Sequence, residues 1–405
     1  MNSFFASVEQ HLRPELRGRP VAVVPVESDN TSVIAASYEA KRLGIKMGTR
    51  VGDARALCPA LQVVQARPDE YVRVHEAIAQ SIDTCAPVHK VYSIDEWAIQ
   101  LAPEERTPKA AKELALRIKS RIRTDFSSAI TCSIGIAPTR LLAKIASDLR
   151  KPDGLTVLQV SDLPHRLEEM SLQDLCGIGR GMAQRLAQNN IRTIAELWQL
   201  DRRQSILVWG SVSGAHWWAG FHGQDEPEIP TRRGSMTHAN VLEPRFRNSA
   251  GARAMLMRLI CRLGSRLRAD NYLAASLSVY IEQGGGSEFS TGVDLPLVND
   301  TPSLLEAFYT LWSRRLPART ATPIHVGVTV SGLVHASQVA GNLFRQADKS
   351  IRLSRAMDRI NQTWGLTSLY VGSMHGCLHH MDDKIAFGRI PPRIKLVPRT
   401  RRGVV

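Results

Sequence analysis

The chain has 405 residues, of which 43% are hydrophobic and 22% are charged. This length allows two to four domains, and the composition excludes a wholly disordered or a fibrous protein. The 52 basic and 38 acidic side chains give a formal net charge of +14, which favours a polyanionic partner and makes nucleic acid the first candidate.

Neither membrane insertion nor secretion is indicated by the sequence. No run of about 18 apolar residues occurs, and residues 1–5 lack the charged and apolar regions of a signal peptide. Six cysteines are scattered without a CxxC pair, at positions 58, 85, 132, 176, 261 and 377. We therefore expect a cytoplasmic protein with no membrane contact and with reduced, mostly buried thiols.

Apolar periodicity predicts an α+β region over the first 155 residues. The predicted elements are a hairpin over residues 21–26 and 32–38, a helix over 71–86, a second hairpin over 88–101, a helix over 109–122, a half-buried strand over 129–136 and a helix over 139–150. The second hairpin carries Asp95 and Glu96 near its turn. The segment Lys151-Pro-Asp-Gly154 ends the last helix, because proline cannot continue it.

The pattern changes character twice after residue 155. Residues 161–228 are predicted to be mainly helical, residues 224–230 form a polar linker, and residues 231–345 mix strands with two amphipathic helices. The first of these helices has an apolar stripe, made of Leu256, Leu259, Ile260, Leu263 and Leu267. Arg258, Arg262 and Arg266 recur on another face, where they repel one another unless an anion covers them.

Asp95 and Glu96 are the first candidates for chemistry. Adjacent carboxylates are costly to bury without compensation, by several kcal/mol or more. Two Mg²⁺ ions held by carboxylates and substrate phosphates would compensate them, as in in-line nucleotidyl transfer. On the dipeptide alone, a solvated surface pair is the favoured explanation.

Order and spacing across the first 155 residues strengthen the chemical interpretation. The segments concerned are Met1-Asn-Ser-Phe-Phe-Ala-Ser-Val-Glu9, Ser37-Tyr-Glu-Ala-Lys-Arg-Leu-Gly44, Tyr92-Ser-Ile-Asp-Glu96, Ser133-Ile-Gly-Ile-Ala137, Leu142-Ala-Lys-Ile-Ala-Ser-Asp148 and Lys151-Pro-Asp-Gly154. Together they resemble the ordered motif series of the Y-family translesion DNA polymerases. The segment Cys176-Gly-Ile-Gly179 extends the resemblance, which covers about residues 1–345.

The resemblance implies a multidomain α+β fold with a right-hand polymerase-like architecture. Its expected parts are a palm over residues 1–10 and 71–160, fingers over 11–70, a helical thumb with a helix-hairpin-helix over 161–230, an α/β little finger over 231–345 and a C-terminal extension with a basic tail over 346–405. The implied activity is template-directed, low-processivity translesion synthesis, with a dNTP and primer-template DNA as substrates.

The resemblance also assigns the catalytic residues. Asp95 and Glu96 would be catalytic and would ligate two Mg²⁺ ions, together with the backbone carbonyl of Met1. Phe5 matches the steric-gate position, whose ring leaves no space for a 2′ hydroxyl, and Phe4 would help to shape the same floor.

Further assignments concern the triphosphate. Tyr38 and Lys41 match fingers residues that touch it, and Lys151 matches a palm lysine that does the same. The family often has arginine where Lys41 stands; a lysine keeps the charge but not the bidentate fork.

Contacts to DNA are expected from the thumb and the little finger. Gly177 and Gly179 resemble the thumb turn that lets a phosphate approach free N–H groups. Nine arginines and two acids lie between residues 231 and 280, and the candidates for backbone contact are Arg232, Arg233, Arg258, Arg262 and Arg266. Leu343 and Phe344 are candidates for contact with a sliding clamp.

One departure leaves two hypotheses open. In the family an aspartate precedes the residue that matches Met1, and Asn2 stands where many members have a second aspartate. We expect a start assigned a few residues downstream; the alternative is a non-catalytic DNA-binding accessory protein that has lost metal chemistry. The presence of Asp95 and Glu96 favours the enzyme.

Other motifs carry little weight. Met182 breaks a GxGxxG pattern, and no Walker lysine, HExxH or GxSxG motif occurs. His375, Cys377, His379 and His380 do not have the spacing of a standard zinc site.

Overall fold

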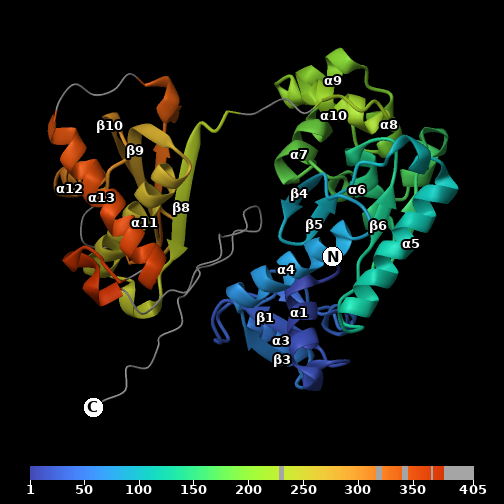
Figure 1. Ribbon diagram of the computed structural model, residues 1–405, viewed down its shortest axis with the longest axis horizontal. Helices are drawn as coiled ribbons and strands as arrows, with labels where there is room; N and C mark the ends of the chain where they lie inside the picture. The colour runs from blue at the N-terminus through green and yellow to red at the C-terminus, as the bar shows by residue number, and fades with distance from the viewer. Residues whose placement is uncertain (228–231, 316–321, 340–344, 366–367, 378–405) are drawn as a thin grey trace. The chain divides into compact units, whose positions relative to one another are not determined.

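The computed structural model describes residues 1–227, 232–315, 322–339, 345–365 and 368–377 (Figure 1). Its contacts divide the chain into two compact units, whose described parts are residues 1–227 and 232–377. The boundary falls within the segment 224–230 that was predicted as a linker. The finer division of the first unit into palm, fingers and thumb stays a prediction.

The first unit opens with a helix and a small sheet. The elements are α1 (Phe4–Leu12), β1 (Val21–Val24), β2 (Ala35–Ala36), α2 (Tyr38–Arg42), α3 (Val51–Leu57) and β3 (Gln62–Gln65). Strand β1 pairs antiparallel with β2, so the predicted hairpin is confirmed, although its second strand is short. On its other side β1 pairs in parallel with β3, which was not predicted because parallel strands join distant segments through a long connection.

The next segment carries the hairpin with the two carboxylates. Its elements are α4 (Pro68–Asp83), β4 (Lys90–Ser93), β5 (Glu96–Ala98), α5 (Pro108–Asp125), β6 (Ile134–Ile136), α6 (Arg140–Leu149) and β7 (Leu155–Val157). The three helices and the hairpin agree with the prediction. The predicted strand over 129–136 is wrong for residues 129–133, because β6 pairs only with the three residues of β7. A Cβ on Gly135 would collide with the main chain of Ala143, so glycine here lets α6 approach β6.

The rest of the first unit is mainly helical, as predicted. After three short 3-10 turns within residues 160–174 come α7 (Arg180–Gln188), α8 (Ile194–Trp198), α9 (Arg202–Trp209) and α10 (Ser213–Phe221). These helices share an apolar cluster with α6, in which Leu142, Leu186 and Phe221 are buried. The cluster therefore joins the helical segment to the element that precedes Lys151.

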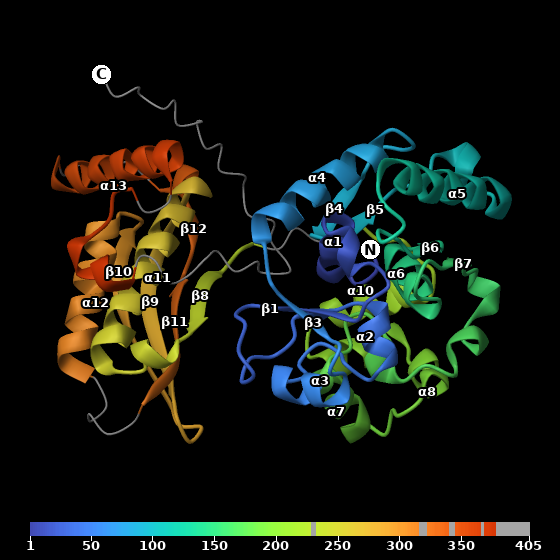
Figure 2. The same cartoon turned by 90° about the horizontal axis from the view of Figure 1, so that it is seen from below.

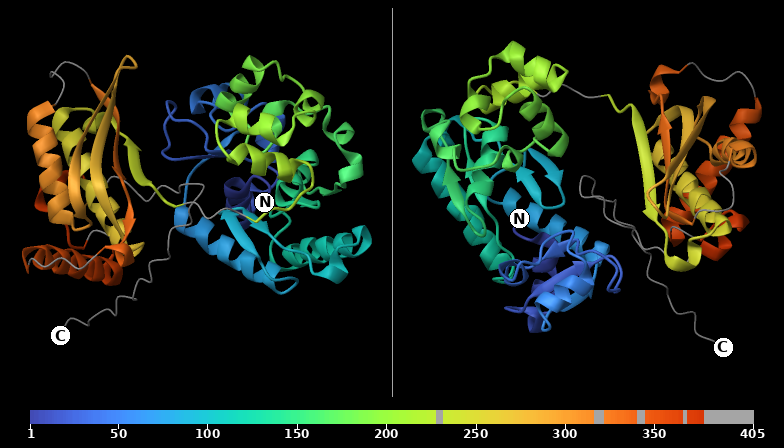
Figure 3. Two further views of the ribbon diagram at one scale, coloured as in Figure 1. Left: turned by 90° about the horizontal axis from the view of Figure 1, so that it is seen from above. Right: turned by 180° about the vertical axis from the view of Figure 1, so that it is seen from behind.

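The second unit is built on one antiparallel sheet. Its elements are β8 (Ser235–Val241), α11 (Ser249–Ala269), β9 (Tyr272–Gln283), β10 (Glu288–Val298), α12 (Thr301–Arg315), β11 (Pro323–Ser331), β12 (Val334–His335) and α13 (Arg345–Trp364). The strand order is β10-β9-β11-β8, with β12 beside β9, and β8 forms one edge (Figure 3). Helices α11 and α12 pack against this sheet (Figure 2). The two amphipathic helices are thus confirmed, whereas α13 was not predicted.

Helix α11 confirms its predicted apolar stripe and corrects its predicted arginine row. All five stripe residues are buried in the core of the unit. Arg258 is also buried, with 3% exposure, and Arg262 and Arg266 are half-buried. One guanidinium nitrogen of Arg266 donates to the carbonyl of Thr237 on β8, at 3.4 Å. The prediction of a separate basic face is therefore wrong for Arg258, because α11 packs against both the sheet and α12.

Helix α13 is attached by polar contacts. Arg268 on α11 makes a two-fold ion pair with Asp358, at 2.6 and 2.8 Å, and also donates to the carbonyl of Asn299 at 2.6 Å. The Arg268 side chain is only 6% exposed. The Ser354 hydroxyl accepts from the backbone N–H of Thr301 at 3.0 Å. The position of α13 against α11 and α12 is therefore set by buried hydrogen bonds as well as by apolar contacts.

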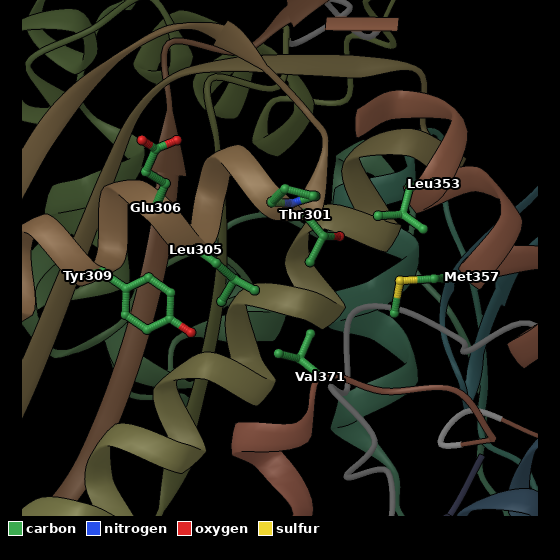
Figure 4. Close-up of a pocket in the computed structure, with 8 residues that line it drawn as sticks. Thr301, Leu305, Glu306, Tyr309, Leu353, Met357 and Val371 are labelled. Carbon is green, nitrogen blue, oxygen red and sulfur yellow. The ribbon is translucent and has the colours of Figure 1, made fainter. Parts of the chain in front are cut away.

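An open groove of about 370 Å³ lies between α12 and α13 (Figure 4). Its lining is mostly apolar and consists of Thr301, Pro302, Leu305, Glu306, Tyr309, Leu353, Met357 and Val371. None of the predicted site residues lines it.

The described cysteines and helices bear on two expectations. Cys58 and Cys132 are buried free thiols, but Cys85, Cys176 and Cys261 are half-buried, so the expectation of mostly buried thiols is wrong for these three. Burial raises the pKa of Cys261 to about 12. Across the described part of the chain, no helix has both the length and the apolar character needed to cross a membrane.

Replacing Asp358 should loosen α13. Asp358→Ala leaves the buried guanidinium of Arg268 without its counter-ion, at a cost of about 3 to 5 kcal/mol. Hydrogen exchange of residues 349–364 should then be at least 100-fold faster, since each 1.4 kcal/mol is a factor of ten. The combined change Arg268→Leu and Asp358→Leu should restore much of the protection. Glu288→Ala, an exposed acid on β10, is the control. Unaltered exchange in Asp358→Ala would contradict this account of α13.

Candidate active site

The two predicted carboxylates lie at the tip of the β4–β5 hairpin. Asp95 is in the turn and Glu96 is the first residue of β5. The register shifts between the pairs Val91–Trp97 and Ser93–Glu96, which leaves Tyr92 as a bulge. The hydroxyl of Ser93 donates to Asp95 Oδ1 at 2.7 Å and accepts from the Asp95 backbone N–H at 3.3 Å. The tip is thus ordered by a local hydrogen bond next to an irregular ladder.

Helix α6 supplies a cation to this tip. Lys144 Nζ lies 2.9 Å from Glu96 Oε1 and 3.1 Å from Asp148 Oδ2. Asp148 in turn pairs with Lys151, at 2.6 Å. Burial works to lower the pKa of Lys144, but its hydrogen bond to Glu96 and the charge of Asp148 outweigh burial and raise it above the ordinary value. The hairpin and α6 are therefore joined by a row of alternating charges, here named the ion row: Glu96, Lys144, Asp148 and Lys151.

Tyr38 and Lys41 reach the same place from α2. The Lys41 ammonium lies 4.5 Å from the centroid of the Tyr38 ring. Burial lowers the pKa of Lys41, and the positive charge of Lys151 lowers it further. Burial raises the pKa of Tyr38, against the effect of its hydrogen bond to Asn2, and the charge of Asp148 adds to the rise. Two lysines from distant segments thus repel each other across a site that an anion would stabilise.

Phe4 and Phe5 form part of the core beside this site. Both are 4% exposed, and the Phe5 ring stacks on Tyr71 of α4 with centroids 4.4 Å apart. The Tyr71 hydroxyl donates to Glu9 at 2.8 Å, and Arg67 donates to both oxygens of Glu9, at 3.1 and 2.6 Å. The ring of Phe5 is therefore backed by a hydrogen-bonded, buried group of side chains.

Asp95 and Glu96 fit a hard divalent cation. Mg²⁺ in sites that also bind phosphates is held by one or two carboxylates, and the phosphates complete its shell. Among the described residues, no group of three or more His, Cys, Asp or Glu side chains could hold a metal by itself. Met1 lies next to the pair, with its nitrogen 2.5 Å from the Asp95 carbonyl oxygen. Asp95 and Glu96 therefore suit a Mg²⁺ ion whose remaining ligands are oxygen atoms of a bound substrate.

The glycines of the helical segment have different surroundings. Gly177 has a φ of +91° and its Cβ position lies 3.1 Å from Trp217 Nε1, which donates to the Cys176 carbonyl at 3.0 Å. Gly179 caps the N-terminus of α7, and nothing lies within 4 Å of its Cβ position. The first glycine is required by the backbone, and the second leaves the helix start open to an approaching group.

The remaining predicted residues are scattered. Arg232 and Arg233 are exposed at the start of the second unit, and Arg233 pairs with Asp270 at 2.5 Å. Leu343 and Phe344, the candidates for the sliding clamp, lie outside the described residues. So does the basic tail after residue 377, with His379 and His380; His375 contacts the Tyr370 hydroxyl at 2.6 Å.

Several residues of the site were missed by sequence reasoning. Lys144 and Asp148 belong to a motif that was recognised, and their spacing of four on a helix already predicts an ion pair. Glu9 also belongs to a recognised motif, but Arg67 and Tyr71 gave no local signal, because their contacts with Glu9 join α1 to a segment some sixty residues away. The role of such residues depends on tertiary packing.

Comparison with known proteins places the chain in a family. Residues 1–148 match the impB/mucB/samB family, and residues 233–343 match the C-terminal domain of that family. The chain is 33% identical over 371 residues to "DNA polymerase IV" of Moorella thermoacetica, a match that covers 90% of this chain and 92% of the relative. It is 27% identical over 391 residues to "DNA polymerase IV 1" of Bacillus subtilis, covering 92% and 91%.

Solved structures match most of the chain in fold. A Y-family DNA polymerase chimera, Dbh-Dpo4(243-245)-Dbh, matches with a TM-score of 0.66 and 23% identity over 82% of this chain and 97% of that one. An insertion ternary complex of Dbh DNA polymerase matches with a TM-score of 0.53 and 24% identity, with the same coverage. The predicted α+β, right-hand polymerase-like architecture is confirmed.

Gly177 offers a test of the turn before α7. Gly177→Ala should cost about 1 to 2 kcal/mol, because a Cβ is disfavoured at positive φ and would press on Trp217. The matched control is Gly181→Ala, in the first turn of α7 with open space around it, which should be neutral or stabilising. Thermal unfolding should therefore occur at a lower temperature in the first variant and not in the second. Equal melting temperatures would mean that the turn is not held as described.

Proposed function

We propose, from the premise that this chain belongs to the impB/mucB/samB family of Y-family DNA polymerases, that the site around Asp95 joins dNTPs to a primer end. The protein is a DNA-directed DNA polymerase for translesion synthesis. The site assignment rests on segments that are distant in the sequence but lie close together in the structure. The ion row joins residues 95–96 to residues 144–151. Tyr38 and Lys41 interact with Asn2, Asp148 and Lys151, which brings in residues 1–2 and 38–41. The reaction depends on divalent metal ions, and we assign two Mg²⁺ ions to Asp95 and Glu96.

In this proposal the carboxylates of Asp95 and Glu96 bind the divalent metal ions. Divalent ions bound there supply Lewis-acid stabilisation of the charge that develops as the primer 3′ hydroxyl attacks the α-phosphate and pyrophosphate leaves. Asp95, fixed by Ser93, and Glu96, held by Lys144, present their oxygens from a single turn. The Met1 carbonyl is a third proposed oxygen.

Lys41 and Lys151 are proposed to contact the triphosphate of the incoming nucleotide. Burial lowers the pKa of Lys41, and the like charge of Lys151 lowers it further, so a triphosphate between the two ammonium groups would offset this repulsion. Tyr38 stands beside Lys41 and Asn2, with its ring available to the same ligand. We therefore assign these three residues to the incoming nucleotide.

Phe5 is assigned to the sugar of the nucleotide and Phe4 to the adjoining floor. A ring that stacks on buried Tyr71 cannot easily withdraw, so a 2′ hydroxyl would meet a fixed obstacle. Rigidity of this kind is what selection between two sugars that differ by one oxygen requires.

We assign DNA contacts to residues in the first unit and, separately, to residues in the second unit. In the thumb, the open start of α7 at Gly179 can accept a phosphate oxygen, with Gly177 shaping the turn. In the little finger, the exposed Arg232 and Arg233 are the favoured cations, with Arg262 and Arg266 secondary. Arg258 is withdrawn, because a buried guanidinium cannot meet a phosphate without rearrangement. Clamp contact through Leu343 and Phe344 remains a proposal from the sequence.

The accessory-protein hypothesis is not favoured by the relatives. A non-catalytic protein would also have no need to keep Asp95 and Glu96 ordered at the hairpin tip, with Lys144 paired to Glu96.

Asp95→Ala should abolish metal-dependent primer extension and leave primer-template affinity within about twofold. The reason is that the variant loses a metal ligand but no phosphate contact. Extension is measured on labelled primer-template with Mg²⁺, for the chain both as printed and with an aspartate joined ahead of Met1. Glu113→Ala, an exposed acid on α5, is the matched control. Undiminished extension by Asp95→Ala would remove Asp95 from the mechanism.

Phe5→Ala should admit ribonucleotides. Loss of the ring opens the space that a 2′ hydroxyl would occupy, so the ratio of dNTP to rNTP incorporation should fall by at least tenfold. Phe126→Ala removes a ring that packs on His11 at the end of α5 and serves as the control. Sugar selectivity that stays the same in Phe5→Ala would count against the assignment of this ring.

A further inference from the structure

The imidazole of His75 contacts the turn of the hairpin and its second strand, β5. His75 is on α4 and is 4% exposed. Its Nδ1 lies 2.6 Å from the carbonyl oxygen of Ile94, the residue before Asp95. Its ring stacks on Trp97, the residue after Glu96, with centroids 4.8 Å apart and planes 16° apart. One side chain therefore contacts the residues on either side of the carboxylate pair.

The hydrogen bond acts on the peptide unit that carries Asp95. The carbonyl of Ile94 and the N–H of Asp95 belong to the same planar group. His75 holds the oxygen of that plane and the Ser93 hydroxyl holds its nitrogen, at 2.6 and 3.3 Å. Because both ends of this plane are held, the peptide unit that leads into Asp95 is restrained, and so is the position of the Asp95 Cα from which the carboxylate extends.

The hairpin by itself does not provide this rigidity. Tyr92 is a bulge, and β5 has only three residues, so few ladder hydrogen bonds reach the tip. The stack on Trp97 adds a second point of support on β5. Helix α4, with Tyr71 and Ile78 fully buried, provides the rigid base for the imidazole.

The protonation state agrees with a structural donor. Since a carbonyl oxygen only accepts, Nδ1 carries the proton in this contact. Burial lowers the pKa of His75, against its hydrogen bond to Ile94 and the charges of Glu76 and Asp95. The ring therefore donates from Nδ1, and burial favours its neutral form.

We propose that His75 is a positioning residue for metal binding, which orients Asp95 through the Ile94 carbonyl and Glu96 through the Trp97 ring. This inference rests on the proposed role of Asp95 and Glu96. It assigns to α4 a function beyond core packing, since losing a partner that orients a metal ligand typically weakens metal binding about 10- to 100-fold.

Two substitutions separate the hydrogen bond from the packing. His75→Phe keeps a flat ring for Trp97 but has no donor, whereas His75→Asn has an amide nitrogen close to the place of Nδ1 but no ring. Mn²⁺ is the probe, titrated by electron paramagnetic resonance into the full chain with primer-template and a non-hydrolysable dNTP. We expect His75→Phe to weaken Mn²⁺ binding at least tenfold and His75→Asn to remain within about threefold of the unaltered protein.

Controls distinguish positioning from loss of stability and from failure of the proposed site. Ile82→Ala lies in the same helix and core, about two helical turns beyond His75, and should lower the melting temperature without changing Mn²⁺ affinity. If His75→Phe also leaves Mn²⁺ affinity unchanged, or if His75→Asn is as weak as His75→Phe, the positioning role is wrong. If the unaltered protein and Asp95→Ala bind Mn²⁺ equally, the proposed metal site itself is wrong.

Discussion

Asp95 and Glu96 are neighbours in the chain, so a fold that holds them at one hairpin tip must balance two like charges in a small volume. The balance comes from α6, whose Lys144 lies between Glu96 and Asp148. Asp148 also binds Lys151, so the ion row continues as far as the residue assigned to the triphosphate. The ion row therefore links the hairpin carboxylates to Lys151, which we propose to contact the triphosphate.

Apolar packing determines how firmly these charges are held. Helices α1 and α4 pack together, and their aromatic rings support the site at two points: Phe5 on Tyr71, and His75 on Trp97. Each support ends in a hydrogen bond, to Glu9 in one case and to Ile94 in the other. Side chains that look like ordinary core residues are therefore connected to the orientation of the reacting groups.

Local features of the fold could be predicted from the sequence. The β4–β5 hairpin, the apolar stripe of α11 and the mainly helical segment after residue 160 each depend on residues that are close in the chain. The motif series identified Asp95, Tyr38, Lys41 and Lys151, and the structure brings these residues together.

Features that depend on distant contacts could not be predicted. The pairing of β1 with β3 and the short β6–β7 pair join segments separated by helices. Periodicity suggested a free basic face on α11, but packing on the sheet and α12 buries Arg258. His75 gave no signal, because a histidine in an apolar helix is most often a core residue; only its distance to Ile94 reveals its contact with the hairpin.

The most direct test of the central claim is a crystal structure of the full chain with primer-template, a non-hydrolysable dNTP and Mn²⁺, using the anomalous signal of manganese. The account predicts anomalous density beside the carboxylates of Asp95 and Glu96, with the triphosphate between that density and the ammonium groups of Lys41 and Lys151. A nucleotide bound without manganese at the hairpin tip, or manganese bound elsewhere on the chain, would contradict it.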